Sequence, residues 1–150
     1  MVPASILANA KLVLLALNRT GVRYALCGGL AMAVHATPRA TKDIDILIAS
    51  EDDLAAIDAA LTHEGWISTS NPIDFPDGFR LHRRIRFVDG RSLILDLLIA
   101  PPGDDLLAGR FLGHFDGCAA WVIGRDALIR MKRSAGRPRD LADIADLEGA

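Results

Sequence analysis

The feature that most constrains this chain is a pair of acidic residues inside an apolar strand, in the run Asp43-Ile44-Asp45-Ile46-Leu47-Ile48. Alternate side chains of a strand share a face, so Asp43 and Asp45 point to one side while the isoleucines point to the other. Two like charges on one face of such a strand repel each other and lose hydration. A cation or a set of hydrogen bonds must compensate them. Mg²⁺, a hard ion that prefers carboxylate oxygens, is the obvious candidate.

A glycine pair stands ahead of the acidic strand. Residues 22–27 are predicted to form a buried strand that ends at Gly28-Gly29, and residues 30–36 to form a short apolar helix. Without Cβ atoms the glycines let a phosphate approach the backbone, and the N-terminus of the helix offers N–H groups to an anion. A glycine pair alone is more often an ordinary turn. With the acidic strand so close, we interpret the two features as a site for a nucleoside triphosphate and magnesium.

The composition is that of an ordinary globular protein. The chain has 150 residues, of which 51% are hydrophobic and 24% charged, so we predict a single domain over residues 1–150. A net charge of −2 gives no global sign of a nucleic-acid binder. No apolar run reaches transmembrane length, and the apolar N-terminal stretch lacks a basic leader. The widely spaced Cys27 and Cys118 indicate buried thiols. We therefore expect a cytoplasmic protein without a membrane partner.

Helical and strand patterns are mixed along the chain. Helices are predicted at 5–18, 30–36, 50–64, 104–109, 126–134 and 138–148, and strands at 22–27, 43–49, 66–70, 80–88, 92–99 and 119–123. Asp89-Gly90 is a strong hairpin signal between two of these strands. This mixture predicts an α/β (α+β) fold in which helices flank a mixed sheet and the C-terminus is helical.

Asp96 is a third notable carboxylate, because it lies in the apolar run Leu93-Ile94-Leu95-Asp96-Leu97-Leu98-Ile99. A buried and unpaired acid would cost several kcal/mol or take up a proton. An exposed position at the edge of the sheet is the alternative interpretation. If this strand lies beside the strand of Asp43 and Asp45, three carboxylates converge. Three acids can hold two magnesium ions, one on a triphosphate and one that lowers the pKa of an attacking hydroxyl.

Two motifs follow one another along the chain: Cys27-Gly28-Gly29 and, after thirteen residues, Asp43-Ile44-Asp45-Ile46. Together they match a known signature, which consists of an apolar residue, a glycine, a glycine or serine, a spacer, and then acid–apolar–acid–apolar. The chain thus resembles the nucleotidyltransferase superfamily related to DNA polymerase beta, and Leu95-Asp96-Leu97 is similar to the third acidic motif of that superfamily. The resemblance implies a nucleotidyltransferase-type mixed sheet. It also implies transfer of a nucleoside monophosphate from a triphosphate to a hydroxyl, with release of pyrophosphate.

A more particular resemblance rests on Arg39-Ala40-Thr41-Lys42-Asp43-Ile44-Asp45 and on the C-terminal motifs at 128–132 and 136–144. These segments are similar to the minimal nucleotidyltransferases of the abortive-infection AbiEii type, which occur among bacterial toxin–antitoxin systems. The chain is shorter than the full toxins of that group. Whatever their further helical regions contribute to acceptor binding is therefore expected to be absent or supplied by another chain.

The superfamily resemblance also implies roles for individual residues. Asp43, Asp45 and Asp96 would be the catalytic residues and the ligands of Mg²⁺ or Mn²⁺, with Asp96 polarising the acceptor hydroxyl. The predicted nucleotide-binding residues are Gly28, Gly29, Arg39, Lys42 and Lys132. Solvated positions fit Arg39 and Lys42 equally well, and the polar face of a helix fits Lys132 equally well. Asp140 lies near a predicted helix start, where an acid is favoured in any case.

The acceptor and the partners stay open at this stage. The acceptor is an RNA end such as that of a transfer RNA, a protein side chain, or a small molecule such as an aminoglycoside. The RNA hypothesis rests on Arg84 and Arg86, which share a strand face with Arg80 and His82 and are predicted to lead a phosphate backbone toward Asp96. A solvated edge rich in arginine is the alternative. The competing function is a non-catalytic binding module, an antitoxin or a partner subunit.

Overall fold

The computed structural model describes residues 4–38 and 40–149. Within them the chain forms one seven-stranded sheet with the order β3-β4-β5-β2-β1-β7-β6. The strands are β1 (Tyr24–Cys27), β2 (Asp43–Ile48), β3 (Ile73–Asp74), β4 (Arg80–Val88), β5 (Arg91–Ile99), β6 (Phe111–Phe115) and β7 (Cys118–Val122). The helices are α1 (Ala4–Thr20), α2 (Gly28–His35), α3 (Leu54–Leu61), α4 (Arg125–Ala135) and α5 (Pro138–Gly149), with short 3-10 turns η1 (Glu51–Asp53) and η2 (Thr62–Glu64) on either side of α3.

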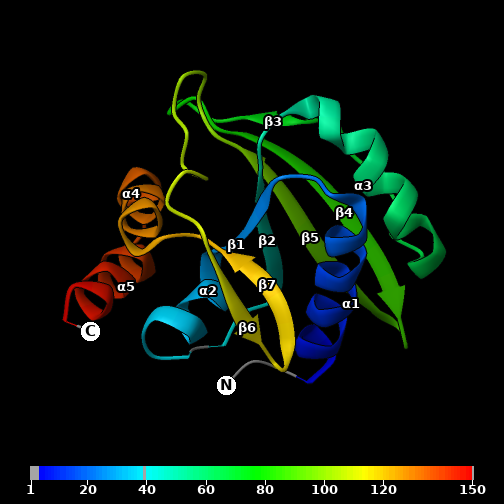
Figure 1. Ribbon diagram of the computed structural model, residues 1–150, viewed down its shortest axis with the longest axis horizontal. Coiled ribbons are helices and arrows are strands. Elements are labelled where there is room, and N and C mark those ends of the chain that lie inside the picture. Colours follow the sequence, from blue (N-terminus) through cyan, green and yellow to red (C-terminus); the bar gives the residue numbers. More distant parts are fainter. Residues whose placement is uncertain (1–3, 39, 150) are drawn as a thin grey trace.

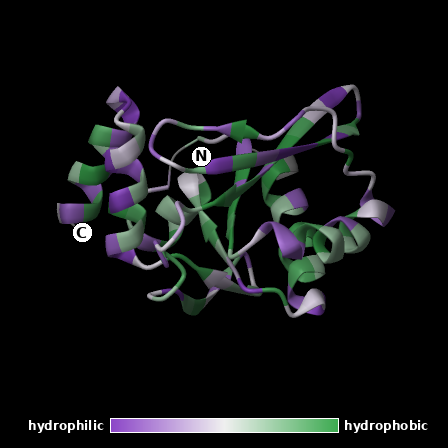
Figure 2. Cartoon of the chain, turned by 90° about the horizontal axis from the view of Figure 1, so that it is seen from above, coloured by the Kyte–Doolittle hydropathy of each residue, from purple (hydrophilic) through white to green (hydrophobic). Residues whose placement is uncertain are grey.

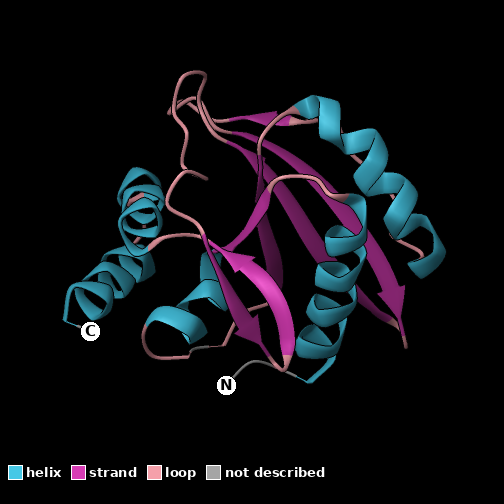
Figure 3. Ribbon diagram, viewed as in Figure 1, coloured by secondary structure: helices cyan, strands magenta, loops and turns pink. Residues whose placement is uncertain are grey.

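Helices cover both faces of the sheet (Figures 1 and 3). One face packs against α1 and α3 around a core that includes Ile44 and Ile46 of β2. The other face packs against α2, α4 and α5 around a second core that includes Leu47. Figure 2 shows hydrophobic residues concentrated on the central strands, whereas the helices carry both classes of residue. The alternation along β2 therefore sends its isoleucines toward α1 and its odd-numbered residues toward α4 and α5.

The central strand β2 pairs antiparallel with β1 and parallel with β5. The β4–β5 hairpin turns at Asp89-Gly90, where both residues have positive φ, as the Asp-Gly signal predicts. The α+β class, the mixed sheet with flanking helices and the helical C-terminus are all confirmed. In the described part of the chain, no helix is both long and apolar enough to cross a membrane.

Some predicted elements are wrong in detail. Residues 104–109 form turns instead of a helix, and the aspartates there bind arginines of other elements, as in the pair of Asp104 with Arg130. Of the predicted strand 66–70 only one bridge forms, between Ile67 and Ile85. Strand β6 was not predicted, although the Asp-Gly turn at residues 116–117, again with positive φ, was a usable hairpin signal.

Candidate active site

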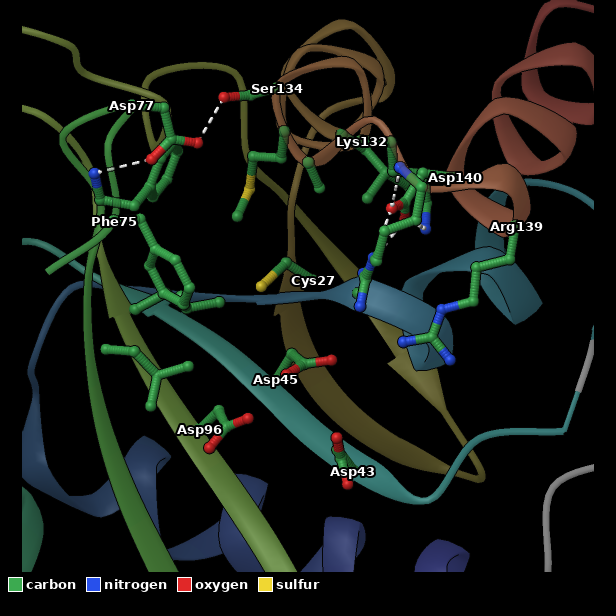
Figure 4. Close-up of a pocket in the computed structure, with 18 of the residues that line it drawn as sticks. Cys27, Asp43, Asp45, Phe75, Asp77, Asp96, Lys132, Ser134, Arg139 and Asp140 are labelled. Atoms are coloured by element: carbon green, nitrogen blue, oxygen red, sulfur yellow. Dashed lines mark hydrogen bonds and ion pairs between the residues drawn. The ribbon is translucent and has the colours of Figure 1, made fainter. Parts of the chain in front are cut away.

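A cavity of about 590 Å³ opens on the face of the sheet that carries α4 and α5 (Figure 4). Its floor comes from strands β1, β2, β4 and β5, and its walls come from α4, the start of α5 and the loop before β4. The charged residues that line it are Asp43, Asp45, Asp77, Arg83, Asp96, Lys132, Arg137, Arg139 and Asp140. An apolar wall is formed by Phe75, Phe79, Leu81, Leu98, Leu128 and Met131. The cavity therefore combines a strongly charged end with an apolar one.

The register of β2 and β5 brings the acids to one face. Asp45 is the direct partner of Asp96 in this parallel pair, and Asp43 lies two residues earlier on the same face as Asp45. Asp96 is 3% exposed and lies on a strand that is paired on both sides. The prediction that Asp96 lies on the face of Asp45 is confirmed, and the alternative of an exposed edge position is wrong.

Gly28 packs directly on the carboxylate of Asp45. Its φ of +62° is a left-handed conformation, and a Cβ built on it would lie 2.1 Å from Asp45 Oδ2. Glycine is therefore required here for two reasons: its backbone has positive φ, and a Cβ would clash with the carboxylate of Asp45. Helix α2 begins at Gly28 and so includes the glycine pair in its first turn. Gly29 is buried in that turn and, unlike Gly28, does not line the cavity.

The acidic pair is only partly compensated by the protein. Burial, together with the nearby charges of Asp96 and Asp43, raises the pKa of Asp45 to about 7. Lys132 and Arg137 oppose this shift without cancelling it. The pKa of Asp43 is also raised, by burial and by Asp96. A site that disfavours its own carboxylate charges in this way would gain free energy from an added cation.

Asp96 has a protein partner of its own. Arg83 of β4 donates from Nε to Asp96 Oδ1 at 2.8 Å and from Nη2 to Oδ2 at 3.0 Å. Among the described residues, no group of three or more His, Cys, Asp or Glu side chains converges closely enough to hold a metal ion. The three acids thus share a face without forming a closed ligand set.

Lys132 is buried in the wall of the cavity instead of lying on a solvated helix face. Its Nζ donates to Asp143 Oδ2 at 2.8 Å and lies 3.9 Å from Asp140 Oδ1. Asp140 in turn accepts from the backbone N and the Nε of Arg137, at 3.2 and 2.6 Å, where α5 begins. These contacts attach Lys132 to α5 (Figure 4), and its charge lowers the pKa of Asp45.

The other basic residues near the site only partly match the predicted nucleotide-binding set. Arg137 and Arg139 line the cavity, although neither was among the predicted nucleotide-binding residues. The signal was present in the sequence, because these arginines flank Pro138 at a helix start, where the N–H groups of the helix favour an anion. Lys42 is exposed and lies outside the cavity lining. Arg39 lies outside the described residues.

The prediction that Arg84 and Arg86 lead a phosphate backbone to Asp96 is wrong. Because side chains alternate along β4, both arginines lie on the opposite face from Arg83. Arg84 is 7% exposed and binds Asp58 of α3 through two hydrogen bonds of 2.8 and 3.0 Å. Arg86 binds the side chain of Asn9. These arginines attach helices to the sheet and are not available to the cavity.

Comparison with known proteins identifies the fold. The sequence matches no protein-family model and no curated protein. Among solved structures, the Thermotoga maritima protein TM1012, assigned as a nucleotidyltransferase, has a TM-score of 0.72 at 16% identity, over 97% of this chain and 93% of that chain. The antibiotic-resistance factor ANT(2'')-Ia, solved with adenylyl-2''-tobramycin, has a TM-score of 0.66 at 14% identity, over 96% and 88%. The chain has the nucleotidyltransferase fold.

A third structure agrees with these two. A nucleotidyltransferase-like antigenic protein of Paracoccidioides brasiliensis has a TM-score of 0.60 at 17% identity, over 97% of this chain and 75% of that chain. Identities this low show a shared fold and leave the chemistry to be argued from the residues of this chain.

The packing of Gly28 on Asp45 can be tested by adding one methyl group. Gly28→Ala should destabilise the protein by about 1–3 kcal/mol more than Gly21→Ala. Gly21 also has positive φ, but a Cβ there would meet nothing within 4 Å. The two variants therefore share the backbone strain and differ only in the clash. Urea unfolding at neutral pH measures the difference, and equal losses would contradict the contact.

The raised pKa of Asp45 predicts that this residue lowers the free energy of unfolding by an amount that depends on pH. The folded protein keeps this proton up to about pH 7, whereas the unfolded chain loses it near pH 4, so the contribution of Asp45 to stability falls as pH rises between these values. In metal-free buffer, Asp45→Asn should therefore gain stability relative to wild type, reaching about 1–3 kcal/mol at pH 8 and less at pH 5. Unfolding curves across this range measure it. Asp89→Asn, at an exposed hairpin tip, controls for loss of a surface charge; the same pH trend there would contradict the assignment.

Proposed function

We propose that the protein is a magnesium-dependent nucleotidyltransferase, with Mn²⁺ as an alternative ion. It would transfer a nucleoside monophosphate from a nucleoside triphosphate to a hydroxyl and release pyrophosphate. The observation that carries this proposal is the register of Asp45 with Asp96 on parallel neighbouring strands, with Asp43 on the same face, beneath a wall of cationic side chains. The shared fold with nucleotidyltransferases supports it.

The donor set suits a hard divalent ion. Asp43 and Asp45 offer carboxylate oxygens whose charge the protein itself compensates poorly, and Asp96 lies beside them in register. These three residues would hold the metal. When bound, the ion would neutralise charge on the triphosphate and lower the pKa of the attacking hydroxyl.

The residues of the chain would do the rest of the work by positioning and electrostatics. The acceptor oxygen bonds to the α-phosphorus while the bond from that phosphorus to the bridging oxygen breaks, and pyrophosphate leaves with the electron pair. Asp96 would polarise the hydroxyl, and the proton that the hydroxyl loses would pass to water in the open cavity. Lys132, Arg137 and Arg139 would balance the charge of the phosphates from the opposite wall. Gly28 keeps the floor of the cavity free of a side chain.

The apolar end of the cavity would take the nucleobase. Phe75 is 40% exposed and, with Phe79 and Met131, lines this end. Aromatic and thioether side chains offer a flat, polarisable surface for a base. The loop that carries Phe75 is attached to α4, because Ser134 Oγ donates to Asp77 Oδ2 at 2.5 Å. The contact joins two segments that line this cavity.

The acceptor belongs to the same proposal. The motif from Arg39 to Asp45 supports an AbiEii-type enzyme, which would make the chain the toxin of a toxin–antitoxin pair, with RNA such as a transfer RNA end as acceptor and an antitoxin as partner. The ANT(2'')-Ia structure, which contains adenylyl-2''-tobramycin, supports a small-molecule acceptor instead. We place the protein in the cytoplasm, which suits the buried free thiols of Cys27 and Cys118.

One observation favours the competing function of a non-catalytic binding module. Arg83 occupies both carboxylate oxygens of Asp96, as a fixed structural ion pair would. Turnover separates the two functions, because a binding module would hold the nucleotide without labelling any acceptor.

Labelling with radioactive nucleotides tests the proposed function directly. Each α-labelled nucleoside triphosphate is incubated with the protein, Mg²⁺ and a cell extract, and the labelled species is identified as RNA, protein or small molecule. Labelling should require the metal and fall by more than about 10³-fold in Asp45→Asn. Triphosphate should also raise the melting temperature only when Mg²⁺ or Mn²⁺ is present. Equal stabilisation in a chelator, with no labelled acceptor, would establish the binding module.

The role of Arg139, at the start of α5, can be measured with a matched pair of variants. Arg139→Ala removes a cation that lines the cavity, so the KM for the triphosphate should rise by about tenfold with little change in stability. Arg133→Ala removes an exposed cation of α4 that does not line it and should leave KM unchanged. A similar rise in both variants would indicate a general effect of surface charge.

A further inference from the structure

In the ion pair between Arg83 and Asp96, the acid is the buried partner and the arginine is the more exposed one. The Asp96 side chain is 5% exposed, whereas that of Arg83 is 35% exposed and borders the cavity. The acid is thus fixed on a central strand and the cation is free on one side to move into an open space. The neighbouring pair of Arg84 with Asp58 has the reverse arrangement, with side-chain exposures of 8% and 44%.

The two arginines form a natural comparison within one strand. Both make two hydrogen bonds to a carboxylate, and in both pairs the distances are 2.8 and 3.0 Å. Arg84 is enclosed against α3, so moving its guanidinium away from Asp58 would leave a buried charge without its ion-pair partner. Arg83 faces a cavity that would hold an anionic triphosphate. An arginine there can exchange one oxyanion partner for another at little cost in solvation.

The charge of Arg83 also acts on the other two acids. Asp43 and Asp45 both favour its charged form, after Asp96 itself. In the metal-free protein Arg83 therefore stands where a divalent ion would otherwise balance the three carboxylates. The same guanidinium binds both carboxylate oxygens of Asp96, and the described residues form no closed metal site.

We propose that Arg83 is a positioning residue that holds Asp96 in the metal-free protein and releases it to the divalent ion. This inference rests on the proposed function, because it assumes that Asp43 and Asp45 bind the metal. Release of Asp96 completes the ligand set, and the freed guanidinium turns to the phosphates in the cavity. Metal and triphosphate then bind cooperatively, since each removes one partner from the Arg83–Asp96 pair.

Metal binding without nucleotide tests the proposal. In chelator-treated protein at pH 8, Mn²⁺ is titrated into wild type, Arg83→Gln and Arg84→Gln and followed calorimetrically. Arg83→Gln should bind Mn²⁺ about tenfold more tightly than wild type, because a competing cation beside the carboxylates is gone. Arg84→Gln should keep the wild-type Kd. Both variants lose a bidentate ion pair, so a general loss of stability cannot account for a change confined to Arg83.

Two further variants keep the outcome decisive. Arg83→Lys retains the charge but not the bidentate geometry, and it should give an intermediate Kd even if the glutamine variant folds poorly. In an Asp96→Asn background, Arg83→Gln should lose most of its gain, because the two residues act through one contact. Unchanged or weaker Mn²⁺ binding in Arg83→Gln overturns the inference. Two other results overturn the proposed function itself. Either the wild-type protein binds no Mn²⁺, or the Asp45→Asn variant binds Mn²⁺ as tightly as the wild type does.

Discussion

The parallel pairing of β2 with β5 is the interaction on which the rest of the site depends. It puts Asp45 beside Asp96 and, in the same register, puts Ile46 beside Leu97 on the other face. The apolar face is buried against α1 and α3, and its burial contributes the free energy that holds the two strands in register. A slip of one residue would exchange the faces, burying the acids under α1 and exposing the isoleucines. The hydrophobic core and the acidic cluster are therefore specified by the same pairing.

Close approach of these acids costs stability, and the structure shows how that cost is limited. Asp96 is held by Arg83, and Asp140 and Asp143 are held by Arg137 and Lys132. The charges of Lys132 and Arg137 lower the pKa of Asp45 but do not cancel the effect of burial and of the neighbouring acids, so this pKa remains raised. The least compensated carboxylate is also the one that Gly28 approaches most closely. Uncompensated charge is concentrated where a ligand would bind, as is common at functional sites.

The sequence was sufficient for the elements whose signals are local. Alternation in Asp43-Ile44-Asp45-Ile46 predicted the two faces of β2, and Asp89-Gly90 predicted the hairpin. The convergence of Asp96 with Asp45 depends on strand order, which no local pattern encodes, and the sequence supported it only as a conditional statement. The partner of Asp96 was not predicted, although the two-residue turn at Asp89-Gly90 sets the register of β4 against β5 and so places Arg83 opposite Asp96.

Strand β4 shows why a basic cluster in a sequence is not yet a basic surface. Its arginines lie within a few residues of each other, but a strand divides consecutive side chains between two layers of the protein. Arg84 and Arg86 became attachments for α3 and α1, and Arg83 alone reached the cavity. The cations of the cavity wall instead came from α4, from α5 and from the turn between these helices, some fifty residues away along the chain. A charged site in a fold of this kind is assembled from residues that share a face, and directly adjacent residues of one strand do not share one.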